Sequence, residues 1–291
     1  MRPTQPLVSL ARRRRARALC RMAAAPVLGA LPVVVCVGDS LTEQAAQPGG
    51  WGALLQNRYV SRRDVLLRGM SGYNSRWLWA CLPRTLPQQP SDRPSGPSHV
   101  AAVTLLIGTN DAVDPRAPSG PGWPQQHVDV AEFERNLDAM VDHLLGVRNA
   151  DGSSPVVLVA SPPPADGDSW HRFLLGLLET VPPSAPRQRS CERVRPYADV
   201  ARRVVEARRL SGPASLAFVD LYDAMLADSE WRRFLCDDGV HFSQAGNKFL
   251  CDKLCDAMAS FEGPAETLPR HAPHFFEVEA AFAHLDEDAI P

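Results

Sequence analysis

The stretch Val-Val-Val-Cys-Val-Gly-Asp-Ser at residues 33–40 decides the fold of this chain. Five apolar residues, four of them β-branched, give way abruptly to glycine and polar residues. A continuous apolar run of this kind predicts a strand that is covered on both faces, as in a parallel sheet. The polar residues that follow should lie at the carboxyl edge of that sheet, where ligands bind in folds of this class.

Four more apolar segments continue this pattern, and amphipathic segments separate them. We expect strands at 33–37, 65–67, 100–107, 156–160 and 216–219. We expect helices at 51–60, 75–82, 130–147, 191–210 and 244–259. The alternation predicts an α/β domain with a five-stranded parallel sheet. Prolines interrupt this alternation of strands and helices. The second helix should therefore stop at Pro83, and residues 83–98, which contain five prolines, should form a loop.

Charge is distributed unevenly along the chain. The 291 residues carry a net charge of −2 and are 45% hydrophobic, which is typical of a globular protein and argues against a general nucleic-acid binder. Residues 1–31 contain seven arginines and no acid, whereas residues 261–291 contain seven acids and one arginine. We therefore divide the chain into a basic N-terminal extension (1–31), a central domain (32–260) and an acidic C-terminal tail (261–291).

Several features bear on the cellular compartment. The seven cysteines form no C-x-x-C pair and there is no N-glycosylation sequon, which favours a reducing, cytoplasmic location. The Arg-rich start leaves an organellar targeting peptide open, and a disordered extension is the other interpretation. The apolar residues 23–37 are too few for a membrane span and run directly into the first strand. We therefore expect no transmembrane segment.

Three polar residues have the types and spacing needed for nucleophilic catalysis. Ser40 follows the first strand and begins a helix, where backbone N–H groups favour developing negative charge. With Glu43 it also matches a capping box, which is a purely structural alternative. Asp238 and His241, three residues apart on one loop, can supply a general base and the carboxylate that orients it.

An oxyanion formed at Ser40 would need hydrogen-bond donors around it. Asn110 can donate from its side-chain amide, and the backbone N–H of Gly72 can approach closely because glycine has no Cβ. The backbone N–H of Ser40 is a third donor. Each has a simpler explanation, since Asn110 could be an ordinary turn residue and Gly72 could only permit a tight bend.

Together these segments resemble the four blocks of the SGNH (GDSL) hydrolase family. The blocks are Gly-Asp-Ser-Leu at 38–41, Gly72, Gly-Thr-Asn-Asp at 108–111 and Asp-Gly-Val-His at 238–241. Segments 68–77, 161–164, 218–221 and 238–243 resemble the isoamyl acetate-hydrolysing esterase branch in particular. The resemblance covers about residues 33–260, and the basic start, the Pro-rich insert and the acidic tail depart from it.

The resemblance implies a fold and a function. The fold is a three-layer α/β/α sandwich, flavodoxin-like, around the five-stranded parallel sheet. The function is a serine esterase that hydrolyses short-chain, acetate-type esters through an acyl-enzyme, without cofactor or metal. Ser40 would be the nucleophile and first oxyanion donor, Gly72 and Asn110 the other donors, His241 the base and Asp238 its partner.

Three other classes of function use residues of these types. A carbohydrate O-deacetylase or a thioesterase would share the same fold and residues. A metallophosphoesterase would use Asp39, Asn110, Asp111 and His241 as ligands, but the chain lacks the D-x-H motif of such sites. A non-catalytic binding protein of this fold would typically have lost the serine, asparagine or histidine. The expected partner is a small-molecule ester and no nucleic acid, and the sequence does not reveal an oligomeric state.

Overall fold

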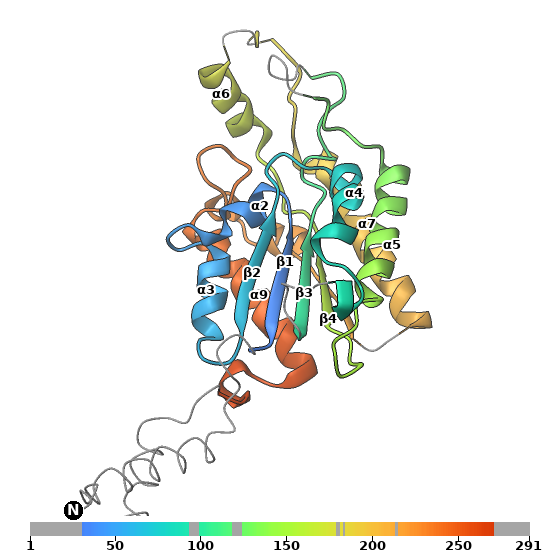
Figure 1. The fold of residues 1–291 in the computed structure, drawn as a ribbon. Helices are drawn as coiled ribbons and strands as arrows, with labels where there is room; N and C mark the ends of the chain where they lie inside the picture. Colours follow the sequence, from blue (N-terminus) through green and yellow to red (C-terminus); the bar gives the residue numbers. More distant parts are fainter. Residues whose placement is uncertain are drawn as a thin grey trace, which may run out of the picture.

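Five parallel strands form the centre of the protein in the computed structural model, which describes residues 31–92, 99–117, 124–178, 181–182, 184–212 and 215–270. The order across the sheet is β2-β1-β3-β4-β5 (Figure 1). The strands are β1 (Val33–Gly38), β2 (Asp64–Gly69), β3 (Val100–Leu106), β4 (Val156–Ala160) and β5 (Leu216–Val219). All neighbouring pairs are parallel, which confirms the expected sheet.

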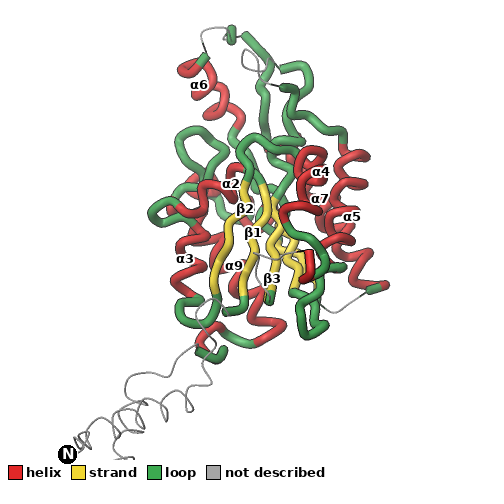
Figure 2. Tube along the Cα trace, in the orientation of Figure 1, coloured by secondary structure: helices red, strands yellow, loops and turns green. Residues whose placement is uncertain are grey.

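Helices cover both faces of this sheet, so that the strands lie enclosed between two helical layers (Figure 2). One layer contains α4 (Ser75–Thr85), α5 (Val130–Leu145) and α7 (Cys191–Ser211). The other contains α2 (Ser40–Glu43), α3 (Trp51–Arg58) and α9 (Gln244–Glu262). Side chains of β1 alternate between two cores, with Val35 in the first and Val34 in the second. The α/β/α sandwich is thereby confirmed.

Shorter helices lie in the connections. They are η1 (Gln44–Ala46), η2 (Pro90–Asp92), α6 (Gly167–Leu177), α8 (Tyr222–Leu226), η3 (Trp231–Phe234) and η4 (Ala265–Thr267). α6 lies beyond the carboxyl ends of the strands, at the top of Figure 1. Its Trp170 and Leu174 pack with Val240 in a small cluster separate from the two main cores. The described parts of the β4–α7 connection (161–178, 181–182 and 184–190) therefore extend over the edge of the sheet where the polar motifs gather.

The prediction that the second helix stops at Pro83 is wrong, because α4 continues through this proline to Thr85. Pro83 lies in the last turn, where the missing N–H removes a single intrahelical bond. The bond from Leu86 N–H to the Leu82 carbonyl remains at 2.9 Å, and both leucines are buried against the core. Burial of these side chains outweighs the lost hydrogen bond. The short helix η2 then follows within residues 83–98, where only a loop was expected.

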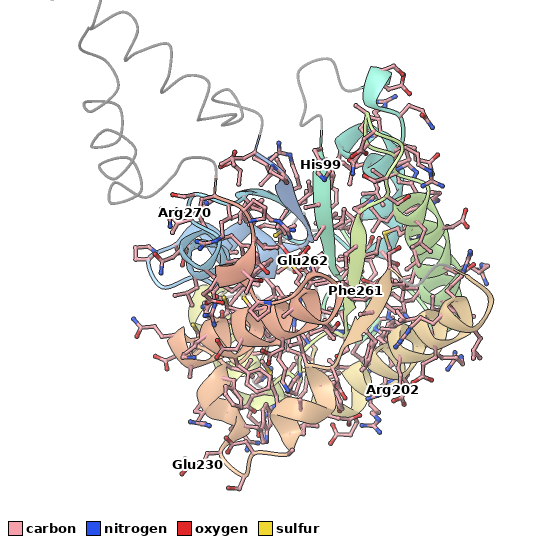
Figure 3. The ribbon with its side chains drawn as sticks, turned by 90° about the horizontal axis from the view of Figure 1, so that it is seen from below. His99, Arg202, Glu230, Phe261, Glu262 and Arg270 are labelled. Atoms are coloured by element: carbon pink, nitrogen blue, oxygen red, sulfur yellow. The ribbon has the colours of Figure 1, made fainter. Side chains whose placement is uncertain are left out.

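The last helix crosses the molecule to the amino edge of the sheet. Figure 3 shows Phe261 and Glu262 at that end, on the same side as His99, which directly precedes β3. Arg63 forms an ion pair with Glu262, and Arg62 donates to the backbone carbonyl of Glu266 at 3.1 Å. The first ten residues of the acidic tail are thus described as a continuation of the fold. The remainder of that tail and nearly all of the basic extension lie outside the described residues.

No helix among the described parts of the chain is long and apolar enough to cross a membrane.

Candidate active site

A chain of two hydrogen bonds connects the serine, the histidine and the aspartate expected to act together. Ser40 Oγ lies 3.0 Å from His241 Nε2, although the two residues are 201 positions apart in the sequence. His241 Nδ1 lies 2.6 Å from Asp238 Oδ2. The second carboxylate oxygen of Asp238 accepts backbone N–H groups from Val240 and His241, both at 2.9 Å. Asp238 therefore stabilises the loop that carries it and also fixes the orientation of the His241 imidazole.

The start of α2 explains why the Ser40 hydroxyl faces the histidine. Asp39 caps this helix, and its Oδ1 accepts the Leu41 N–H at 3.0 Å. Glu43 turns instead toward the neighbouring loop, where it accepts from Ser71 N–H at 2.8 Å and from Ser71 Oγ at 2.7 Å. The capping-box interpretation of Ser40 and Glu43 is therefore wrong. The adjacent aspartate takes the capping position, so the serine side chain is not needed there.

The loop that carries Asp238 and His241 is tightly closed. The N–H of Cys236 donates to the His241 carbonyl at 2.7 Å, and the N–H of Gly239 donates back to the Cys236 carbonyl at 2.8 Å. Gly239 has φ +74°, a conformation that favours glycine. Burial acts to raise the pKa of Asp238, but hydrogen bonds from His241 and from two backbone N–H groups outweigh it and hold the pKa below its usual value. The carboxylate is therefore anionic where it meets the imidazole.

The two further oxyanion donors expected from the sequence lie beside this serine. Gly72 has φ +79°, and its carbonyl accepts from Gln126 Nε2 at 2.8 Å. Within the described residues, no hydrogen bond occupies the N–H of Gly72. Asn110 donates from Nδ2 to the Tyr73 carbonyl at 2.9 Å. The loop that contains Gly72 therefore also anchors the side chain of Asn110, and both residues line the same cavity as Ser40.

Four of the five expected residues line one cavity of about 210 Å³, and the fifth, Asp238, contacts His241 from behind it. Its lining comprises Ser40, Gln44, Ser71, Gly72, Asn110, Gln126, Trp170, Arg189, Val240 and His241. A serine hydroxyl bonded to an imidazole, with amide donors facing the same small space, can carry out nucleophilic acyl transfer. The catalytic roles of the individual residues stay predictions.

A second and more apolar cavity of about 530 Å³ adjoins the first. The two share Ser71, Gly72 and Gln126. Trp77 lines the second cavity and stands edge-on to the Tyr73 ring at 6.0 Å. Trp77 thus forms part of a cavity wall, whereas Trp79 on the same helix packs edge-on against the His143 ring at 6.0 Å.

Sequence reasoning missed Arg189 and named Asp111 only as a candidate metal ligand, although both are buried beside this site. Arg189 is almost fully buried and donates from Nη2 to Asn110 Oδ1 at 2.8 Å. Asp111 accepts the Ser75 N–H through both oxygens, at 2.9 and 3.0 Å, and so fixes the start of α4. Burial raises the pKa of Asp111 to about 7. The Gly-Thr-Asn-Asp motif marks Asp111 but does not reveal its bond to the Ser75 N–H, and Arg189 has no local sequence signal at all.

The metal-site hypothesis required Asp39, Asn110, Asp111 and His241 to converge. In the structure, Asp39 caps α2, Asp111 binds the start of α4 and His241 contacts Ser40. Across the described segments, no group of three His, Cys, Asp or Glu side chains is arranged to hold a metal ion.

Comparison with known proteins places this site in a family. The profile of the GDSL-like lipase/acylhydrolase family matches residues 36–249. The chain belongs to this family. As a GDSL hydrolase it acts on carboxylic esters, and the matched range contains every site residue described above.

Relatives of this GDSL hydrolase include the isoamyl acetate-hydrolyzing esterase 1 homolog of Mus musculus, which is 33% identical over 269 residues, or 92% of this chain and 96% of the mouse protein. A GDSL esterase/lipase of Arabidopsis thaliana is 31% identical, covering 83% of this chain and 92% of its own. The crystal structure of the lipase/acylhydrolase from Enterococcus faecalis is similar with a TM-score of 0.55 and 22% identity, covering 79% of this chain and 96% of its own. The crystal structure of the acetyl xylan esterase AlAXEase is similar with a TM-score of 0.55 and 20% identity, and the match covers 77% of this chain and 98% of that chain. These two structures share the fold.

Proposed function

We propose that this GDSL hydrolase is a serine esterase that cleaves short-chain, acetate-type esters through an acyl-enzyme intermediate. The observation that carries this proposal is the unbroken contact from Asp238 through His241 to Ser40, at 2.6 and 3.0 Å. The mouse relative, named for hydrolysis of isoamyl acetate, supports an acetate ester as substrate.

In the acylation step, His241 Nε2 takes the proton of Ser40 Oγ as this oxygen attacks the ester carbonyl carbon. The carbonyl oxygen becomes an oxyanion and accepts hydrogen bonds from the backbone N–H groups of Ser40 and Gly72 and from the side-chain amide of Asn110. Anionic Asp238 stabilises the imidazolium that forms. The imidazolium then gives its proton to the departing alcohol, and the acyl group stays on the serine.

Deacylation repeats these steps with water in place of the serine hydroxyl. His241 takes a proton from water, the hydroxide attacks the acyl-enzyme, and Ser40 leaves with the proton. The 210 Å³ cavity suits a small acyl group next to the nucleophile. A carbohydrate O-deacetylase is the second candidate, because Gln44 and Gln126 in the same lining offer hydrogen-bond partners to sugar hydroxyls.

The mechanism is tested with Ser40→Ala and Asn110→Ala, using Ser91→Ala, at an exposed serine, as the control. Ser40→Ala should lose both turnover and labelling by a fluorophosphonate. Asn110→Ala should remain folded and lose about 100- to 1,000-fold in kcat, the usual cost of one oxyanion donor. Normal ester turnover in purified Ser40→Ala protein would overturn the mechanism.

The substrate is tested with p-nitrophenyl esters of increasing acyl length, measured beside acetylated xylose and acyl thioesters. Acetate should rank among the esters with the highest kcat/KM. If it does not, the acetate assignment is wrong while the esterase mechanism can still hold. A preference for acetylated sugar over the simple acetates would select the deacetylase.

The cytoplasmic location stays part of the proposal. It is supported by the cysteines of the described segments, all of which carry free thiols. Sequencing the N-terminus of the protein isolated from its native cell tests it, since removal of the Arg-rich extension would favour the organellar alternative.

A further inference from the structure

Arg189 reaches the active site from the β4–α7 connection. Only 4% of the residue is exposed. Its Nη2 donates to Asn110 Oδ1 at 2.8 Å, and its Nη1 donates to the Thr109 carbonyl. The guanidinium carbon lies 4.7 Å from the centre of the Trp170 ring. The acyl-transfer steps above do not use this residue, although it lines the same cavity as the serine and the histidine.

The chemistry of the two side chains determines how Asn110 is oriented. A guanidinium carries only donors, so the amide must present its oxygen to Arg189. The amide NH₂ group then points the other way, and one of its N–H bonds goes to the Tyr73 carbonyl. The second N–H is left for the cavity. If the amide were rotated by half a turn, its oxygen would replace this N–H and would repel an oxyanion.

We propose that Arg189 is a positioning residue that fixes the Asn110 amide with its N–H group directed at the oxyanion. The inference rests on the proposed function, in which Asn110 is a donor. A cation on the amide oxygen also draws electron density from the nitrogen, which makes its N–H a stronger donor. The effect on catalysis passes through Asn110, without contact between Arg189 and the substrate.

The surrounding structure holds Arg189 in place. Trp170, which stacks on the guanidinium, donates from Nε1 to Gln188 Oε1 at 2.6 Å. The backbone carbonyl of Gln188 accepts the Asp114 N–H at 2.8 Å. A buried cation is costly unless charges compensate it, and Asp39 and Asp238 attract this one. Trp170 of α6 and the segment around Gln188 thus support the orientation of the Asn110 amide through Arg189.

A double-mutant cycle tests the proposal, with Arg189→Met, Asn110→Ala and the double variant assayed on p-nitrophenyl acetate. Arg189→Met should lower kcat by about 10- to 100-fold with KM nearly unchanged, a smaller loss than removal of the donor itself. In the Asn110→Ala background, Arg189→Met should lower kcat by less than about 3-fold, because the amide that Arg189 positions is absent. Arg187→Met is the matched control, since Arg187 forms an exposed ion pair with Asp168 on the same segment. Its kcat should stay close to that of the wild type.

The possible results separate this inference from the proposed function. If Asn110→Ala keeps its kcat, the proposed oxyanion site fails. If Asn110→Ala loses kcat but Arg189→Met does not, or if the two losses multiply, only the positioning role is overturned. Thermal unfolding shows which variants fold. Should Arg189→Met not fold, Arg189→Lys takes its place in the cycle, and its smaller loss must likewise vanish in the Asn110→Ala background.

Discussion

Replacing Gly69 by alanine should displace the nucleophile without touching any catalytic side chain. Gly69 ends β2 and lies against the backbone of α2, the helix that begins at Ser40. A Cβ at this position would stand 1.9 Å from Glu43 N and 2.4 Å from Glu43 Cα. Ordinary contact begins at 3.4 Å, so the two backbones would have to separate by about 1.5 Å.

Such a shift is large on the scale of the site. The Ser40–His241 contact is 3.0 Å, and a misplacement of about 1 Å can cost about 100-fold in rate. Overpacking of this kind also destabilises a fold by about 1–3 kcal/mol. We therefore expect Gly69→Ala to lose about 100-fold in kcat/KM and about 1–3 kcal/mol in the free energy of unfolding.

The assay combines p-nitrophenyl acetate turnover, the rate of fluorophosphonate labelling and urea unfolding. The matched control is Gly176→Ala in α6, where a new Cβ would meet nothing within 4 Å. This variant should keep its activity and gain about 0.5–1 kcal/mol, because alanine favours a helix over glycine. Wild-type turnover and labelling in Gly69→Ala would refute the reasoning, since they would mean that α2 does not transmit the clash.

Two further predictions concern stability. Burial raises the pKa of Asp111 to about 7, so the folded protein keeps a proton that the unfolded chain releases above about pH 4. The stabilisation that this proton provides is complete below about pH 4 and is lost as pH rises through 7. The free energy of unfolding should therefore fall less between pH 5 and 8 in Asp111→Asn than in the wild type. Equal decreases for the two proteins in urea titrations would contradict this prediction. Ser161 Oγ accepts the buried N–H groups of Leu221 and Tyr222 at 2.9 and 3.1 Å. Ser161→Ala should cost about 1–3 kcal/mol for each N–H left unpaired, and a loss below about 1 kcal/mol in the same assay would mean that another group satisfies them.

The sheet could be predicted because each strand is marked by its own residues. A short apolar run between polar or glycine-containing segments placed β5 at Leu216–Val219, where the structure has it. The end of α4 could not be predicted in this way. Pro83 is a local signal against a helix, but burial of Leu82 and Leu86 depends on a core built from distant segments.

The same distinction applies to the site. Asp238 and His241 share one short loop, so their pairing can be predicted from the local sequence. The choice between Asp39 and Ser40 as the helix cap depends on a histidine 201 positions away. Arg189 meets Asn110 across 79 positions, with no spacing or neighbouring motif to mark the pair. Contacts of this kind follow from the complete fold.

The separation of Ser40 from His241 along the chain has a consequence for how activity appears during biosynthesis. The fifth strand ends at Val219, before the segment that carries Asp238 has been made. A nascent chain could therefore assemble the whole sheet and still lack the base.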